Sequence, residues 1–173
     1  MASDDRSARA QALFEAHWRS VLAYARRRAS SATADEVLSD VYMVAWRRLD
    51  DVPADALPWL LACARSSLAN HRRAQRRRLR LLARLRPTVS DEAPIRLRDG
   101  RLSDALARLG ARDREALLLT AWEGLAAEQA AAVLGCSPQA FRVRLHRARK
   151  RLAQALEPVE ASATAITMEA RNE

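Results

Sequence analysis

The sequence predicts an all-α protein made of two small helical domains joined by a flexible linker. Its apolar content is mostly Ala and Leu, whereas Trp, Tyr and Phe make up only 5% of the 173 residues and there are four Gly and six Pro. This composition favours helices over strands. Apolar residues also recur at helical spacing in two separate parts of the chain. Between them, residues 87–100 contain two prolines and a glycine and lack a clear period, which is typical of a linker.

The first domain is expected to span residues 8–86 and to contain three helices. After a polar, loose start at 1–7, the first helix covers about 8–29. A capping-box pattern from Thr33 to Glu36 predicts the start of the second helix, which runs to about Leu49. Pro53 places a loop at 50–56. The third and longest helix covers about 57–84, and the three helices bury these apolar residues: Leu13, Val21, Leu22, Ala25, Val37, Val41, Ala45, Leu49, Leu60, Leu61, Ala64 and Leu68. Trp18, Trp46, Trp59 and, in the second domain, Trp122 are interpreted as core residues.

The charge of the chain indicates a polyanionic partner. The formal net charge is +9, and the second half of the long helix has no acid between Trp59 and Arg86. Only one of the thirty basic residues is lysine. Arginine suits bidentate contacts with phosphate and guanine, although a GC-rich genome gives the same bias.

The second domain, 101–156, is expected to contain helices near 102–109 and 113–122, followed by a helix-turn-helix. Gly135 suits the left-handed conformation that ends a helix. Ser137 then offers a cap for the next helix, and Pro138 fits its first turn. Residues 157–173 lack a period and are expected to form a mobile tail.

The last helix has the charge and size of a recognition helix for the major groove. Phe141, Leu145, Ala148 and Leu152 fall at helical spacing and are expected to face the core. The candidate DNA-contacting residues share the opposite side: Gln139, Ala140, Arg142, Val143, Arg144, His146, Arg147 and Lys150. An arginine there can read guanine, Gln139 adenine, and Ala140 or Val143 a thymine methyl group. The alternative is an ordinary helical hairpin with solvated arginines, but no acid between Gln129 and Leu156 balances these cations.

Several other classes of function find no support in the sequence. Cys63 and Cys136 lie among small or apolar neighbours, and the three histidines have no ligand spacing, so neither a metal site nor a cofactor is expected. The sequence shows neither a nucleophile paired with a base nor a phosphate-binding loop, so it gives no indication of an enzyme. No signal peptide and no apolar run near the roughly 20 residues of a membrane helix is present. A cytoplasmic protein without membrane insertion is therefore expected.

The order of these elements resembles the extracytoplasmic-function (ECF) sigma factors of bacterial RNA polymerase. The resemblance covers about Leu13 to Leu156. Its most specific parts are RLHRARKRL (144–152) and DEVLSDVYMVAWRRLD (35–50), which is followed by PWLLACAR (58–65). The sequence departs from the family pattern at Ser39 and Asp40, where members often have Gln and Glu, and at Ser66, where many have Asn.

The resemblance implies a dissociable subunit that gives core RNA polymerase its promoter specificity. The first domain (region 2) would dock on the clamp of the largest subunit and open the downstream promoter element. The second (region 4) would read the upstream element and pack on the flap of the second-largest subunit. The implied clamp contacts are Asp35, Glu36, Ser39, Asp40 and Tyr42. The implied downstream contacts are Asp50, Asp51, Val52, Ala54 and Asp55, at a flipped non-template base, and Arg65, Asn70, Arg72, Arg73 and Arg76, along the displaced strand.

Two further hypotheses accompany this interpretation. Sigma factors of this class are commonly held inactive by an anti-sigma protein, and such a partner is expected here. The rival function is a stand-alone helix-turn-helix regulator whose first domain binds a partner. Such a regulator would bind a duplex site tightly without polymerase, whereas a sigma factor would need the core enzyme.

Overall fold

A computed structural model of the chain describes residues 2–83 and 100–157. These residues form seven α-helices and one short 3-10 helix, without a strand, which confirms the all-α prediction. The elements are α1 (Ala2–Arg26), α2 (Ser31–Arg47), the 3-10 helix η1 (Leu49–Asp51), α3 (Ala56–Ala83), α4 (Gly100–Arg108), α5 (Ala111–Ala121), α6 (Ala127–Leu134) and α7 (Pro138–Leu156). The expected linker, apart from Gly100, and the expected tail beyond Glu157 lie outside the described residues.

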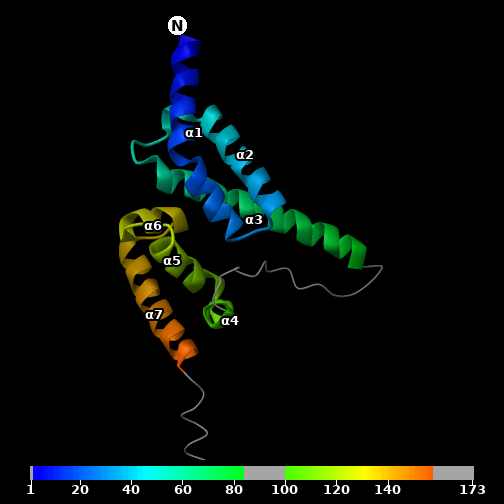
Figure 1. Cartoon of the computed structure of the whole chain (residues 1–173), viewed down its shortest axis with the longest axis vertical. Helices are drawn as coiled ribbons and strands as arrows, with labels where there is room; N and C mark the ends of the chain where they lie inside the picture. Colours follow the sequence, from blue (N-terminus) through cyan, green and yellow to red (C-terminus); the bar gives the residue numbers. More distant parts are fainter. Residues whose placement is uncertain (1, 84–99, 158–173) are drawn as a thin grey trace, which may run out of the picture.

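Helices α1, α2 and α3 pack against one another and form the first helical domain (Figure 1). Each contributes one buried stripe at the spacing of three or four residues that places side chains on a single helix face. Val21 and Ala25 of α1 meet Val37 and Val41 of α2 in this core. The stripe of α3 consists of Leu60, Leu61, Ala64 and Leu68. The predicted apolar faces of α2 and α3 are therefore confirmed.

Two helix starts differ from the prediction. The first helix begins at Ala2 rather than near residue 8. Asp4 and Asp5 in its first turn suit the positive end of the helix dipole, and the Arg6 side chain donates to the Trp46 carbonyl at 2.6 Å. The second helix is capped by Ser30, whose hydroxyl accepts from the Thr33 backbone N–H at 3.3 Å. Thr33 is thus inside the helix, because an earlier residue supplies the cap.

The tryptophans do not all lie in the core. Trp46 is 43% exposed and Trp122 is 38% exposed, so the expectation was wrong for these two, whereas Trp18 and Trp59 pack partly buried against the core. Trp46 comes one position after Ala45, the last buried residue of α2. Its side chain therefore lies at the edge of the contact between α1 and α2 rather than inside it. There the Arg6 guanidinium stacks on it, 5.5 Å from the ring centroid.

Helices α4 to α7 form the second helical domain, which is organised around α7. Phe141, Leu145 and Ala148 of α7 are buried and Leu152 is half-buried against the same core, as predicted. The turn before α7 also has its predicted form. Gly135 adopts a left-handed conformation with φ of 66°, and the Ser137 hydroxyl accepts from the Ala140 N–H at 3.2 Å.

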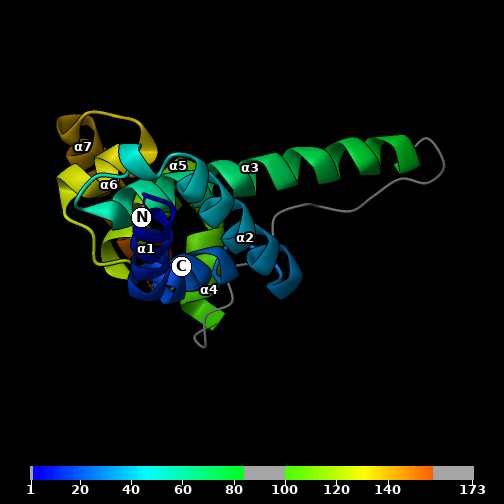
Figure 2. The same ribbon diagram turned by 90° about the horizontal axis from the view of Figure 1, so that it is seen from above.

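The two domains contact each other through α3 and α6 and through the end of α1 and α5. One continuous cluster of buried apolar side chains crosses this contact. The C-terminal half of α3 projects away from both domains (Figures 1 and 2). Its buried stripe ends at Leu68, and the arginines from Arg72 to Arg80 are exposed. This half of α3 is therefore a cationic arm rather than part of the core.

Candidate nucleic-acid interface

The structure brings most of the predicted upstream contacts together on one hollow of the second domain. The hollow has a volume of about 480 Å³ and is lined by Gln139, Ala140, Val143, Arg144, Arg147 and Arg151 of α7, with Ser137 and Asp113 at its edge. These α7 positions form two rows with intervals of three or four residues, 139–143–147 and 140–144–147–151, so together they make one broad stripe of the helix. Val143 is 47% exposed without a packing partner in the core, which leaves an apolar contact surface between the arginines.

Three predicted upstream contacts lie outside this hollow. Arg142, His146 and Lys150 are exposed and follow one another at intervals of four residues, which places them on a neighbouring stripe of α7. The predicted set therefore occupies two adjacent stripes rather than one. Side chains on the two stripes would therefore contact different parts of a DNA groove.

Acidic residues from other helices balance two of the α7 arginines. Arg142 forms an ion pair with Glu128 of α6, and Arg151 forms one with Asp113 of α5. The absence of acids within α7 therefore does not leave its cationic face wholly unpaired. Local sequence could not reveal the pair with Asp113, because 38 residues separate its partners.

The predicted base-capture residues surround η1 at the connection between α2 and α3. Asp50, Asp51, Ala54 and Asp55 are exposed and Val52 is half-buried. The acidic side chains have intramolecular partners: Asp50 pairs with Arg9 at 3.3 Å and Asp51 with Arg48 at 2.9 Å. Asp55 accepts a hydrogen bond from Gln129 of the second domain at 2.7 Å.

The predicted strand-tracking residues lie farther along α3. From Ala56 to Arg72 the helix rises roughly 24 Å, at about 1.5 Å per residue, so the loop and the basic segment are separate contact points. Arg65 and Arg72 line a cleft of about 370 Å³ between the domains. Asn70 and Arg73 instead bond to each other, and Arg76 lies on the projecting arm.

The cleft also contains arginines that the sequence patterns did not single out. Arg28, in the turn that follows α1, and Arg112 of α5 line it together with Arg144 of α7, and Glu115 is the acid among them. No local pattern could have shown this, because the cleft forms only where the two domains meet. The result is a cationic cleft composed of residues from both domains.

Four of the five predicted clamp contacts share one exposed face of α2. Asp35, Glu36, Ser39 and Asp40 fall on adjacent positions of the helix. His71 of α3 approaches this face, with its ring nitrogens 3.4 Å from a Glu36 oxygen and 3.1 Å from an Asp40 oxygen. The fifth contact, Tyr42, lies on another side of the helix.

Tyr42 packs against α1 rather than joining the acidic face. Its ring meets Phe14 edge-on, with centroids 4.7 Å apart. Burial raises the pKa of its hydroxyl to about 12, so the group is neutral at physiological pH. Tyr42 therefore packs α2 against α1, and it lines a small apolar pocket together with Leu13, Phe14 and Trp46.

The residues described here provide neither a metal cluster nor a membrane span. In 2–83 and 100–157, no three His, Cys, Asp or Glu side chains gather at a distance that would hold a metal ion. None of the described helices combines the length and the apolar character needed to cross a bilayer.

Comparison with protein families matches each domain to a separate model. Residues 13–78 match the model for sigma-70 region 2, and residues 99–152 match the model for sigma-70 region 4. The first match covers α2, α3 up to Arg78 and most of α1, and the second covers α4 to α6 and most of α7.

Several characterised proteins are similar over most of the chain. RNA polymerase sigma factor NccH of Alcaligenes xylosoxydans xylosoxydans is 31% identical over 135 residues, covering 71% of this chain and 73% of that protein. The ECF RNA polymerase sigma factor SigC of Mycobacterium tuberculosis is 33% identical over 135 residues, covering 73% of this chain and 71% of SigC.

Solved structures show the same arrangement of helices. The sigma factor RpoE of Bartonella quintana, in complex with the anti-sigma factor NepR, superposes with a TM-score of 0.66 at 24% identity, covering 86% of this chain and 97% of that one. CnrH, a sigma factor of Cupriavidus metallidurans solved with the cytosolic domain of CnrY, gives 0.56 at 28% identity, covering 86% of this chain and 87% of CnrH.

Proposed function

The chain belongs to the extracytoplasmic-function (ECF) sigma factors of bacterial RNA polymerase, and on this premise we propose how its residues divide the work. A protein of this family directs core polymerase to specific promoters and helps to open them for initiation. Region 2 extends over residues 8–86 and region 4 over 101–156, with 87–100 as the linker and 157–173 as a tail. The region 2 limits extend beyond its family match at both ends, whereas the region 4 limits start two residues inside the match and end four residues beyond it. Residue 8 falls within α1, and Gly100, the first residue of α4, falls in the linker.

In region 4, the α7 stripe that lines the 480 Å³ hollow reads the upstream element. This assignment depends on one observation: Gln139, Val143 and Arg147 are exposed, adjacent and not covered by another helix. They supply an amide, a methyl surface and a guanidinium, which suit adenine, thymine and guanine edges. The neighbouring stripe, Arg142, His146 and Lys150, contacts phosphates and fixes the register.

In region 2, two separate points contact the downstream element. Residues 50–55 form the rim at which a flipped base is held, with Val52 as its apolar contact. Removing a base from the stack costs a few kcal/mol, which such a contact can offset. Arg65, Arg72, Arg73 and Arg76, with Asn70, follow the backbone of the displaced strand along α3.

The acidic face of α2 binds the clamp of the largest polymerase subunit. Asp35, Glu36, Ser39 and Asp40 form this face, and Tyr42 supports it through its contact with Phe14. Region 4 carries the contact with the flap of the second-largest subunit. Because initiation by this chain consists of binding and strand separation, it needs no catalytic group of its own. The chain works in the cytoplasm with the polymerase.

An anti-sigma protein is proposed as a further partner. CnrH, which shares the fold and 28% of the aligned sequence, is seen bound to the cytosolic domain of CnrY. The same overall arrangement of both domains in this chain supports a partner of that class, which would hold the sigma factor away from polymerase.

Substitution of one α7 arginine tests the assignment to the upstream element. Arg147→Ala is expected to lower promoter binding by the holoenzyme by about 1–3 kcal/mol, because a bidentate contact with a base is lost. Arg149→Ala is the matched control, since Arg149 is an exposed arginine of the same helix that does not line the hollow.

The measurement is run-off transcription and filter binding with core polymerase on genomic promoter fragments. Base reading also predicts that Arg147→Ala relaxes the sequence preference at a single position, whereas a phosphate contact would weaken all sequences alike. Equal losses for the two variants would reject Arg147 as a base reader.

A further inference from the structure

The cationic cleft between the two helical domains has the size and the charge of a binding site for a small anion. Its volume of about 370 Å³ lies within the range of roughly 300–1,000 Å³ that small-molecule sites occupy in proteins. These side chains come from α3, α5, α7 and the turn after α1. The charged lining consists of one acid, Glu115, and five arginines: Arg28, Arg65, Arg72, Arg112 and Arg144.

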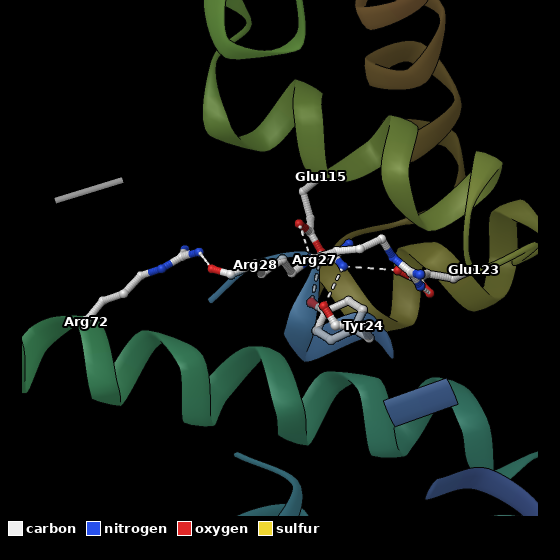
Figure 3. Close-up of polar contacts among 6 residues, drawn as sticks. All are labelled: Tyr24, Arg27, Arg28, Arg72, Glu115 and Glu123. Carbon is white, nitrogen blue, oxygen red and sulfur yellow. Dashed lines mark hydrogen bonds and ion pairs between the residues drawn. The ribbon is translucent and has the colours of Figure 1, made fainter. Parts of the chain in front are cut away.

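The single carboxylate of the cleft already has its partners. Glu115 accepts from Arg28 Nε at 3.0 Å and from the Tyr24 hydroxyl at 2.8 Å (Figure 3). Burial and the neighbouring Glu115 raise the pKa of Tyr24 well above its usual value, so the hydroxyl keeps the proton that it donates. Arg28 also donates through Nη1 to Glu123 at 3.0 Å. Glu115 therefore does not neutralise the other four arginines.

Those four arginines have no acidic partner among the described residues. Arg72 donates to the Arg28 backbone carbonyl at 3.1 Å, and Arg144 Nη1 lies 4.0 Å from the Cys136 sulfur. Arg65 and Arg112 are exposed at the cleft without an ion pair to a described side chain. Like charges around a concave surface focus a positive potential, which attracts an anion from solution.

One buried charged donor at the cleft lacks an acceptor. Arg28 is 5% exposed, and its Nη2 atom is buried without a hydrogen-bond partner. A buried donor of this kind costs stability, so it marks a place that an acceptor can fill. Glu115, Glu123 and the Tyr24 ring enclose other parts of the guanidinium. The cleft that Arg28 lines is therefore the route by which an acceptor can approach Nη2.

The amino terminus of α5 adds backbone donors to the same cleft. Ala111 and Arg112, the first two residues of α5, both line it. The N-cap, Gly110, has no side chain to accept from the first N–H groups of the helix. The first-turn acid, Asp113, pairs with Arg151 and lines the α7 hollow instead. Uncapped N–H groups at a helix start bind phosphate readily, because the helix dipole favours negative charge there.

We propose that the cationic cleft binds a small anion with two adjacent phosphate groups, either free pyrophosphate or a nucleoside diphosphate. A single phosphate group carries roughly −1.5 to −2 charges at neutral pH, so two groups balance four unpaired arginines better than one does. The bound anion would compete with promoter DNA for Arg65, Arg72 and Arg144. This consequence rests on the proposed function, whereas the binding itself does not.

Titration calorimetry of the free chain, without divalent cations, tests the binding. Pyrophosphate and ADP should bind at one site, and AMP, which lacks the second phosphate, roughly tenfold more weakly. Arg112→Gln should weaken pyrophosphate binding roughly tenfold, the effect of losing one hydrogen bond to a charged group. Arg112 is not among the proposed DNA contacts. Arg108→Gln is the matched control, because Arg108 is an exposed arginine of α4 that does not line the cleft.

Alkylation of the two cysteines locates the bound anion. Cys136 lines the cleft beside Arg144, whereas Cys63 of α3 lies outside it, and both are half-buried. Saturating pyrophosphate should slow the reaction of Cys136 with iodoacetamide and leave the reaction of Cys63 unchanged. Mass spectrometry of the labelled chain measures both rates.

A second variant closes the site without threatening the fold. Ala111→Glu places a carboxylate at the first position of α5, where it suits the helix dipole but repels phosphate. It should abolish the protection of Cys136, and circular dichroism should show unchanged helix content. Ala153→Glu, at an exposed position of α7 outside the cleft, is its control and should keep the protection.

Each outcome decides one question. Equal pyrophosphate binding by all four variants, or no protection of Cys136, would overturn the site. Equal affinities for AMP and ADP would overturn the need for two phosphates. Tighter binding of ADP than of pyrophosphate supports a nucleotide as the source, and equal binding supports the free anion. If pyrophosphate protects Cys136 but does not displace duplex DNA, the site stands and the proposed DNA contacts of Arg65, Arg72 and Arg144 are wrong.

Discussion

Asp40 illustrates how a single residue on the proposed polymerase-binding face of α2 also joins two helices of the first domain. The Ser67 hydroxyl donates to its carboxylate at 2.6 Å, and the His71 ring lies 3.1 Å from the same oxygen. The hydrogen bond from Ser67, assisted by His71, lowers the pKa of Asp40 below its ordinary value of 3.8, although partial desolvation acts in the opposite direction. The carboxylate is therefore the form that joins α2 to α3.

This pKa shift predicts a dependence of stability on pH. Because the folded-state pKa is lowered, the stabilisation is fully present above about pH 3.8 and is lost as the pH falls through the folded-state pKa. Asp40→Asn should therefore lower the urea midpoint of unfolding at neutral pH and leave it nearly unchanged in strong acid. Asp104→Asn, at an exposed aspartate of α4, is the control and should show no such convergence. A constant difference at all pH values would contradict the linkage.

At the scale of elements, capping and turn preferences were sufficient to predict the helix-turn-helix. They were not sufficient to predict contacts between helices that are distant in the sequence. Gly135, Ser137 and Pro138 act on their immediate neighbours, so their roles could be read from the sequence. The surroundings of Trp46 depend instead on the first turns of α1, from which Arg6 stacks on its ring. The pairing of Arg151 with Asp113 and of Arg28 with Glu115 joins positions 38 and 87 residues apart, which no helical period encodes. For the same reason, the sequence predicted one DNA-facing side of α7 and the structure divides it into two stripes.

The turn between α6 and α7 provides a prediction at this scale. Gly135 has φ of 66°, and a Cβ added there would meet no atom within 4 Å, so the backbone conformation alone sets the penalty. Gly135→Ala should lower the free energy of unfolding by about 1–2 kcal/mol, and Gly135→Asn should lower it less, because Asn tolerates this conformation. Gly110 is equally open but has φ of −58°, so Gly110→Ala carries no penalty from the backbone conformation. At this N-cap of α5, the poorer capping by Ala is partly offset by the lower entropy of the unfolded chain, so the loss should be smaller than for Gly135→Ala. Urea denaturation measures all three variants, and equal losses at Gly135 and Gly110 would show that φ is not the cause.

For the whole molecule, the arrangement of the arginines matters for DNA affinity in addition to their number. The net charge is +9, and the exposed arginines from Arg72 to Arg80 belong to the half of α3 that projects from both domains. Salt dependence can separate arrangement from net charge, because its slope counts neutralised phosphates.

The logarithm of the affinity of the protein for nonspecific duplex, plotted against the logarithm of salt concentration, should therefore become less steep when arginines of the projecting half of α3 are removed. Each phosphate contact adds roughly 0.9 to the slope, so Arg73→Ala/Arg76→Ala should lower it by about 2. Arg19→Ala/Arg108→Ala makes the same change of net charge at exposed positions of α1 and α4 and should keep the wild-type slope. Fluorescence anisotropy between about 50 and 200 mM salt covers the range in which such contacts change affinity most visibly. If both double variants gave one common slope, the change in affinity would come from net charge, and the projecting half of α3 would not be what contacts the phosphates.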